Sequence, residues 1–169
     1  MTTRRLILIR HAKAEARGGA DAQRRLAPRG ERDARAVGRW LKQAGVTSGV
    51  AAVSPARRTV QTWELAVAEL GRAPKTANDD RLYQNTIEDL LAVIHESPPQ
   101  ARTLVLVGHN PSIEALATAL DDGAGDRAAA GAIAEKFPTS GIAVLEFTGP
   151  WSALAPGTAA LTTFAAPRG

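Results

Sequence analysis

The chain has 169 residues, a formal net charge of +4, a sequence pI of about 10.1 and no cysteine. Without cysteine it forms no disulfide, no catalytic thiolate and no cysteine-ligated metal centre. Its hydrophobic content of 44% suits a globular protein, no apolar run approaches membrane-spanning length, and the first residues, MTTRR, lack a signal-peptide pattern. We therefore expect one cytoplasmic domain over residues 1–169, with no membrane segment.

Much of the positive charge comes from arginines between positions 17 and 39. Acidic residues interrupt this stretch, and no aromatic residues alternate with the arginines to stack on bases. The pattern therefore favours a solvated helix face with a basic rim, and we expect no nucleic-acid partner. Such a rim attracts anionic substrates by electrostatic steering.

The predicted elements alternate between strands and helices. We expect strands at residues 6–9, 49–53, 103–107, 142–147 and 159–164, with a short extended piece at 75–77. We expect helices at residues 28–44, 54–70, from 86 to before the prolines at 98–99, and 110–120, with a mobile loop at 121–132 and at most a short helix after it. This order predicts an α/β fold with a largely parallel sheet covered on both faces and a closing hairpin.

Two of these helices are predicted to begin directly after a strand. Ser54-Pro55 and Asn110-Pro111 each combine a favourable N-cap residue with proline at the first helical position. The amide groups and dipole of such helix N-termini favour an anion.

Basic and imidazole side chains follow three of the predicted strands. Arg10 and His11 come directly after residues 6–9, Arg58 lies in the first turn of the helix after the second strand, and His109 follows the third. The Arg10-His11 pair alone is equally typical of a solvated strand end, but parallel strands bring their carboxyl ends to one edge of a sheet. Two arginines and two histidines gathered there form a site for a tetrahedral dianion, most simply phosphate.

Three ordered motifs carry a family resemblance: RHA at 10–12, SPARRTVQT at 54–62 and VGHNP at 107–111. Together they resemble the histidine phosphatase superfamily, and within it the short SixA-type phosphohistidine phosphatases. The likeness spans residues 4–164, including DAQRRLAPRG at 21–30 and PTSG at 138–141.

The resemblance implies a phosphoglycerate mutase-like fold, a three-layer α/β/α sandwich with a mostly parallel central sheet. It implies that His11 is the nucleophile of a phosphohistidine intermediate and that Arg10, Arg58 and His109 hold the phosphoryl oxygens. It also places Arg24 and Asn110 against the substrate. Arg58 takes this role and Arg57 does not, because Arg58 lies three residues before the Gln61-Thr62 pair.

The chain departs from the family pattern at two positions. Ala12 stands where much of the superfamily has glycine. Larger members carry a proton-donating glutamate after the Arg-Leu pair, whereas here Arg81-Leu82 is followed by Tyr83-Gln84. Gln84 cannot act as a general acid. Asp80, Glu88 and Asp89 lie nearby and are more simply interpreted as a solvated turn and a helix N-terminus.

We expect neither a metal nor a cofactor. The three histidines show no HxH or HExxH spacing, and the arginines supply the positive charge that phosphoryl transfer needs. The third histidine, His95, falls near the end of the helix that is predicted to begin at residue 86. We interpret it as a surface residue or a partner of the helix dipole, and not as a catalytic residue.

These observations leave three functions open. The first is a metal-independent phosphatase that acts through His11 on phosphohistidine displayed by a protein. The second is a hydrolase of phosphomonoesters or phosphoanhydrides of small metabolites. The third is a non-catalytic module that binds phosphate or a phosphoprotein, which has no need of a nucleophile at position 11.

Overall fold

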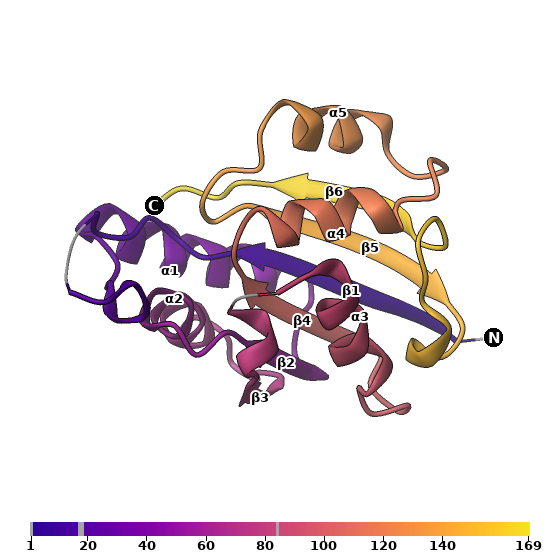
Figure 1. The fold of residues 1–169 in the computed structure, drawn as a ribbon, viewed down its shortest axis with the longest axis horizontal. Helices are drawn as coiled ribbons and strands as arrows, with labels where there is room; N and C mark the ends of the chain where they lie inside the picture. Colours follow the sequence, from indigo (N-terminus) through magenta and orange to yellow (C-terminus); the bar gives the residue numbers. More distant parts are fainter. Residues whose placement is uncertain (1, 17–18, 84) are drawn as a thin grey trace.

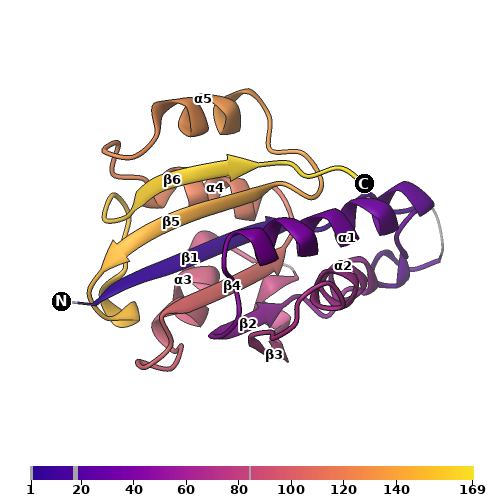
Figure 2. The ribbon, with the colours of Figure 1, turned by 180° about the vertical axis from the view of Figure 1, so that it is seen from behind.

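A computed structural model describes residues 2–16, 19–83 and 85–169 of the chain. A six-stranded sheet lies between two layers of helices (Figures 1 and 2). The strands are β1 (Thr3–Arg10), β2 (Val50–Val53), β3 (Lys75–Asn78), β4 (Thr103–Gly108), β5 (Ile142–Thr148) and β6 (Ala160–Ala165). Their positions confirm the predicted strands, including the short extended piece, which is β3.

The strand order in the sheet is β3-β2-β4-β1-β5-β6. The pairings of β3 with β2, β2 with β4 and β4 with β1 are parallel, whereas β5 pairs antiparallel with both β1 and β6. The mostly parallel sheet and the closing hairpin are therefore confirmed. Because β1, β4 and β2 are adjacent and parallel, their carboxyl ends meet at one edge.

The aliphatic run in β1 is buried on both faces of the sheet. Leu6 and Leu8 pack into the larger hydrophobic cluster, and Ile7 and Ile9 pack into the other. Alternate side chains of a strand point to opposite faces, so a run without polar positions requires a helix layer on each side. This is why the strand before the Arg10-His11 pair occupies the centre of the sheet.

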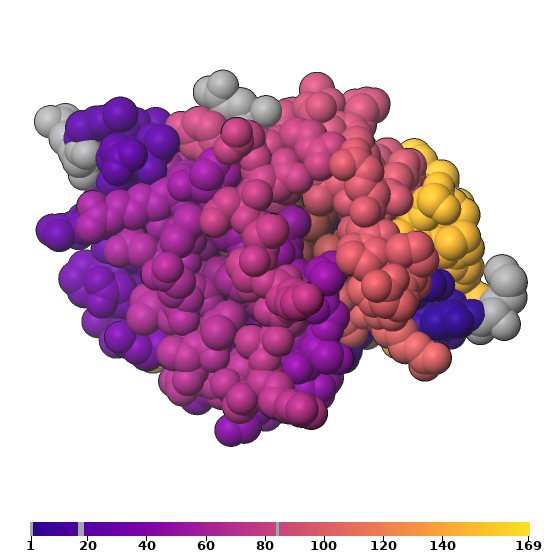
Figure 3. Space-filling model, turned by 90° about the horizontal axis from the view of Figure 1, so that it is seen from below, coloured from indigo at the N-terminus to yellow at the C-terminus, as the bar shows by residue number. Residues whose placement is uncertain are grey.

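The helices are distributed over both faces. Two pack on one face (Figure 2), α1 (Pro28–Gln43) and α2 (Arg57–Val67). Three lie on the other (Figure 1), α3 (Ile87–His95), α4 (Ser112–Leu120) and α5 (Arg127–Glu135). The three-layer α/β/α arrangement is confirmed. The side of the molecule at the β3 edge consists mainly of the middle of the chain, drawn in magenta (Figure 3). No helix of the described residues is long and apolar enough to cross a membrane.

Two predicted helix starts were wrong. The second helix begins at Arg57 and not at Ser54, and the fourth begins at Ser112, with no side-chain cap on either. The Ser54 hydroxyl contacts the imidazole of His109, with 2.8 Å between Oγ and Nε2. Asn110 precedes a cis peptide bond to Pro111, and its Oδ1 accepts a hydrogen bond from the backbone of Glu114. Ser54 therefore makes a tertiary contact before its helix begins, whereas Asn110 bonds to the backbone of the first turn of α4.

The predicted mobile loop at 121–132 was also wrong in part, because α5 begins within it. Asp126 caps this helix by accepting hydrogen bonds from the backbone N–H groups of Ala128 and Ala129. Two residues of this helix, Ala129 and Ile133, are buried. The glycine and alanine content of this segment is typical of a loop, so the sequence did not indicate α5. The helix is stabilised by its N-cap and by the packing of its buried side chains.

Candidate active site

The residues predicted for the site meet where β1, β4 and β2 end. Arg10 closes β1 and His11 follows it, Ser54 follows β2, and His109 follows β4. The ring centroids of His11 and His109 are 5.3 Å apart. The adjacent strands thus gather groups that are up to 99 positions apart in the chain.

His11 is held in one orientation by its surroundings. Its side chain is buried, and Nδ1 lies 2.7 Å from the backbone oxygen of Ala12. A carbonyl oxygen only accepts hydrogen bonds, so the contact assigns the proton to Nδ1 and leaves the lone pair on Nε2. The backbone N–H of His11 donates to Gly108 at 3.1 Å, which fixes the residue to the end of β4.

The turn around Ser140 secures the same strand end from the other side. Its backbone N–H donates to the carbonyl oxygens of Arg10 at 3.1 Å and His11 at 3.0 Å. Ser140 adopts φ of 64°, a left-handed conformation that costs energy for a residue other than glycine. The PTSG segment therefore positions the backbone of the site.

Arg58 turns one edge of its guanidinium toward Asp21. Nη1 donates to the Asp21 backbone oxygen at 2.8 Å, and Nη2 donates to the Asp21 carboxylate at 3.1 Å. The Nε atom is buried and has no hydrogen-bond partner among the described residues. Arg58 is buried and the neighbouring Arg57 is exposed, while the role of Arg58 in phosphoryl binding stays a prediction.

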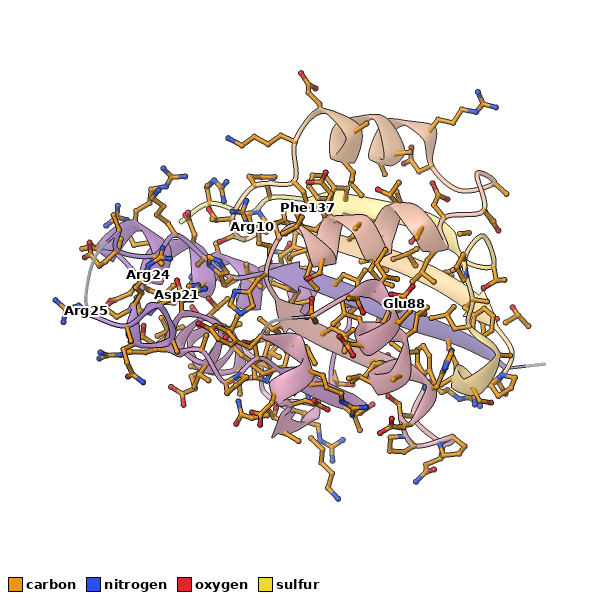
Figure 4. All side chains as sticks on the ribbon, in the orientation of Figure 1. Arg10, Asp21, Arg24, Arg25, Glu88 and Phe137 are labelled. Atoms are coloured by element: carbon orange, nitrogen blue, oxygen red, sulfur yellow. The ribbon has the colours of Figure 1, made fainter. Side chains whose placement is uncertain are left out.

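Arg10 and His109 each carry a second buried nitrogen without a partner among the described residues, Arg10 Nε and His109 Nδ1. Arg10 is anchored through Nη1 to the backbone oxygen of Phe137 at 3.0 Å, and Figure 4 labels the two residues side by side. His109 is anchored through Nε2 to Ser54. Each side chain is fixed at one atom and keeps a further nitrogen unpaired.

Asp21 links three side chains of the site. Its carboxylate accepts hydrogen bonds from Arg24 at 2.9 Å, from Arg58 at 3.1 Å and from the hydroxyl of Tyr83 at 2.6 Å. Tyr83 in turn lies edge-on to His109, with 5.6 Å between the ring centroids. Hydrogen bonds from Tyr83 and Arg24 hold the pKa of Asp21 well below its usual range. Figure 4 shows Asp21 and Arg24 together, whereas Arg25 points away.

Comparison with known proteins agrees with this geometry. The family model of the histidine phosphatase superfamily (branch 1) matches residues 6–84. An uncharacterized protein of Mycobacterium tuberculosis is 40% identical over 162 residues, which span 95% of this chain and 100% of the relative. A solved structure from Nakamurella multipartitia, provisionally named a phosphohistidine phosphatase SixA, is 32% identical with a TM-score of 0.86, and the match covers 99% of this chain and 98% of that chain.

The chain belongs to the histidine phosphatase superfamily. The Nakamurella likeness places it among the SixA-type members. A phosphoglycerate mutase from Plasmodium falciparum shares the fold, with a TM-score of 0.63 at 18% identity over 100% of this chain and 94% of that chain, which confirms the phosphoglycerate mutase-like architecture.

Sequence reasoning overlooked two groups in the site of this histidine phosphatase, Asp21 and Tyr83. It also interpreted Ser54 as a helix cap and not as a partner of His109. The two substrate-binding predictions remain predictions. Arg24 donates from Nε to the backbone oxygen of Glu15 at 2.9 Å and from Nη1 to Asp21. The Asn110 amide donates to Phe137 O at 3.1 Å and to Glu114 at 3.3 Å.

Larger members of the family carry a proton-donating glutamate after the Arg-Leu pair. Among the described residues that follow Arg81-Leu82 here, no carboxylic acid clearly takes its place. Gln84 lies outside the described residues. Asp89 forms a capping box with Thr86 at the start of α3, as its position predicted. His95 lies at the other end of α3, with Nε2 2.7 Å from the backbone oxygen of Leu154. No group of three or more metal-ligating side chains is present in the described part of the chain.

Burial sets the protonation state of both histidines in this phosphatase. It lowers the pKa of His11 to about 3, and the charges of His109, Arg58 and Arg10 add to the effect against the opposing hydrogen bond to Ala12. Burial and the charge of Arg58 lower the pKa of His109 to about 4. Both imidazoles are therefore neutral near pH 7, and a neutral Nε2 on His11 is a competent nucleophile.

The depressed pKa values predict a loss of stability in mild acid. The unfolded chain takes up protons on its histidines near pH 6.5, whereas the folded chain takes them up on His11 and His109 only near 3 and 4. The contribution of these two histidines to the free energy of unfolding is therefore fully present above about pH 6.5, and it decreases as the pH drops toward about 4. Urea unfolding of the wild type and of His11→Ala at pH 7 and pH 5 tests this. The variant is expected to lose less stability, and an equal loss would contradict the assignment.

Replacing Asp21 by asparagine should loosen Arg58. The variant Asp21→Asn keeps the side-chain size but removes the negative charge that pairs with Arg58 and replaces one acceptor oxygen by an amide donor, so we expect kcat/KM to fall on the order of tenfold, with weaker inhibition by vanadate. Asp80→Asn, an exposed change outside this network, is the control. Tighter vanadate inhibition in Asp21→Asn would show instead that the carboxylate competes with the anion.

Proposed function

We propose that this protein is a metal-independent phosphohistidine phosphatase, with His11 as the nucleophile. The observation that carries the proposal is the set of three buried unpartnered nitrogens on Arg10, Arg58 and His109, around an imidazole whose Nε2 lone pair is free. A buried donor without an acceptor costs about 1–3 kcal/mol. The oxygens of a phosphoryl group supply the acceptors, and the two guanidinium groups balance its charge.

The reaction proceeds in two displacements. His11 Nε2 attacks phosphorus, the bond between phosphorus and the leaving nitrogen breaks, and that nitrogen keeps the electron pair and takes up a proton. Water then attacks the phosphorylated His11, which releases inorganic phosphate and restores the neutral imidazole. In both steps Arg10, Arg58 and His109 stabilise the charge on the equatorial oxygens.

The substrate class follows from the side chains near the leaving group. Cleavage of an alkyl phosphate expels an alkoxide, which normally requires a proton donor in the transition state. In a phosphorylated imidazole the P–N bond is labile, and the leaving nitrogen is basic enough to be protonated without a dedicated acid. The carboxyl group that we place in the site, that of Asp21, has its pKa held well below its usual range by hydrogen bonds from Tyr83 and Arg24, so it is ionised and does not donate this proton. This supports phosphohistidine on a protein as the substrate over a sugar phosphate.

The test is to trap the intermediate. The enzyme is exposed briefly to a protein carrying radiolabelled phosphohistidine, quenched in alkali and separated on a gel. Label is expected on the wild type and not on His11→Ala. Efficient hydrolysis of a sugar phosphate with little activity on phosphohistidine would favour the metabolite hydrolase instead. Binding of the phosphoprotein without turnover would favour the non-catalytic module.

The nitrogen-rich clamp also predicts the response to inhibitors and chelators. We expect EDTA to leave the rate unchanged, because the site offers guanidinium and imidazole groups in place of a carboxylate ligand set. We expect phosphate and vanadate to inhibit competitively, since each presents the oxygens that the clamp binds. Activity that EDTA removes and one divalent ion restores would contradict the metal-independent mechanism.

A further inference from the structure

Arg10, Arg58 and His109 together form what we call the phosphoryl clamp. A groove opens beside this clamp and shares His109 with it. We call it the Asn85 groove. It has a volume of about 420 Å³ and is lined by Tyr83, Asn85, Thr86, Ile87, His109, Asn110, Pro111, Ser112 and Ala115. Tyr83 and His109 line it and also belong to the site, so a substrate whose phosphoryl group contacts His109 can reach this groove.

The groove differs from the clamp in its charge. Apart from His109, whose imidazole is neutral near pH 7, none of the described residues that line it is acidic or basic. The clamp, by contrast, contains the guanidinium groups of Arg10 and Arg58. The positive charge is thus confined to the position of the phosphoryl group, and a charged leaving group gains no ion pair within the groove.

The groove also contains an unused hydrogen-bond donor. The Nδ2 atom of Asn85 is buried and has no hydrogen-bond partner among the described residues. An amide N–H only donates, so an acceptor atom is needed to satisfy it. The hydroxyl groups of Thr86 and Ser112 are already engaged, with Asp89 and with the backbone of His109.

We propose that the Asn85 groove binds the leaving-group side of the substrate, namely the imidazole ring of a phosphohistidine and its flanking peptide. Asn85 Nδ2 donates to a peptide carbonyl of that segment, and Ile87, Pro111 and Ala115 contact the ring and the neighbouring apolar atoms. This inference rests on the proposed function and deepens it, because it makes the groove the part of the enzyme that selects uncharged leaving groups. A leaving group that bears a carboxylate finds no lysine or arginine among the described residues that line the groove, so it gains no ion pair there.

The experiment compares two substrates that share the phosphoryl group and differ in what fills the groove. One is a phosphohistidine peptide, and the other is phosphoramidate, whose leaving group is ammonia and does not extend beyond the clamp. Asn85→Ala is expected to lower the ratio of kcat/KM for the peptide to that for phosphoramidate by about tenfold, as expected for a lost hydrogen bond to a buried partner. Gln100→Ala, an exposed amide far from the site, is the matched control and should leave the ratio unchanged.

A second variant tests the charge requirement. Asn85→Asp replaces the donor by a carboxylate at nearly constant size and should lower the ratio further, whereas Gln100→Glu adds the same charge without effect. An unchanged ratio in both Asn85 variants would overturn the inference while leaving the proposed function intact. Wild-type enzyme that hydrolyses neither substrate would overturn the proposed function itself, so the two failures are distinguishable.

Discussion

His11→Ala is expected to reduce the turnover of phosphohistidine substrates by at least about a thousandfold, because it removes the imidazole proposed to form the covalent intermediate. Removing a nucleophile lowers kcat and leaves the phosphate-binding groups in place. The variant should therefore still bind phosphate or vanadate through Arg10 and Arg58, and calorimetry measures that binding separately from activity.

His95→Ala is the matched control, since His95 lies at the far end of α3 and bonds to the backbone of Leu154. Circular dichroism verifies that both variants fold. A folded His11→Ala enzyme with near wild-type turnover would contradict the covalent mechanism, and His11→Asn, which keeps a polar side chain at the position, provides a second test if the alanine variant is unstable.

Arg58→Ala should lower kcat/KM by about a hundred- to a thousandfold, the range that follows loss of one preorganised donor to a developing charge. The effect should be only partly recovered in Arg58→Lys, because lysine cannot bond to Asp21 with one edge and to the phosphoryl group with the other. Steady-state kinetics on a phosphohistidine peptide measures both variants.

Arg57→Ala provides the comparison at the neighbouring position. Arg57 is exposed at the first residue of α2, whereas Arg58 is buried and bonded to Asp21. We expect the Arg57 variant to retain its activity. Comparable losses in both variants would mean that general positive charge on this helix, and not the placement of one guanidinium, supports the reaction.

The architecture could be predicted because its signals are local. The apolar run of β1, the capping box of Thr86 with Asp89 and the glycine at the end of α1 each specify an element within a few residues. The starts of α2 and α4 could not be predicted in the same way. Ser54 fits a helix cap equally well, and only the proximity of β2 to β4 shows that its hydroxyl bonds to His109.

The candidate site shows the same division between local and tertiary information. Arg10, His11, Arg58 and His109 belong to short ordered motifs, so their convergence followed from the order of elements in an α/β fold. Asp21 belongs to an exposed segment and was interpreted as one of the acids that interrupt a basic stretch. Its importance comes from contacts with Arg58 and Tyr83, 37 and 62 positions away. Nothing within a few residues of Asp21 indicates those partners.

The central place of β1 has a consequence for biosynthesis. The strand that precedes His11 leaves the ribosome well before its neighbours in the sheet, which begin only at Thr103 and Ile142, and before Ser140, which holds the carbonyls of Arg10 and His11. A nascent chain without those segments leaves β1 with unpaired edges and the nucleophile without a fixed backbone. Catalytic competence therefore arises late in translation, and prematurely terminated products expose an apolar strand that quality-control proteases and chaperones recognise.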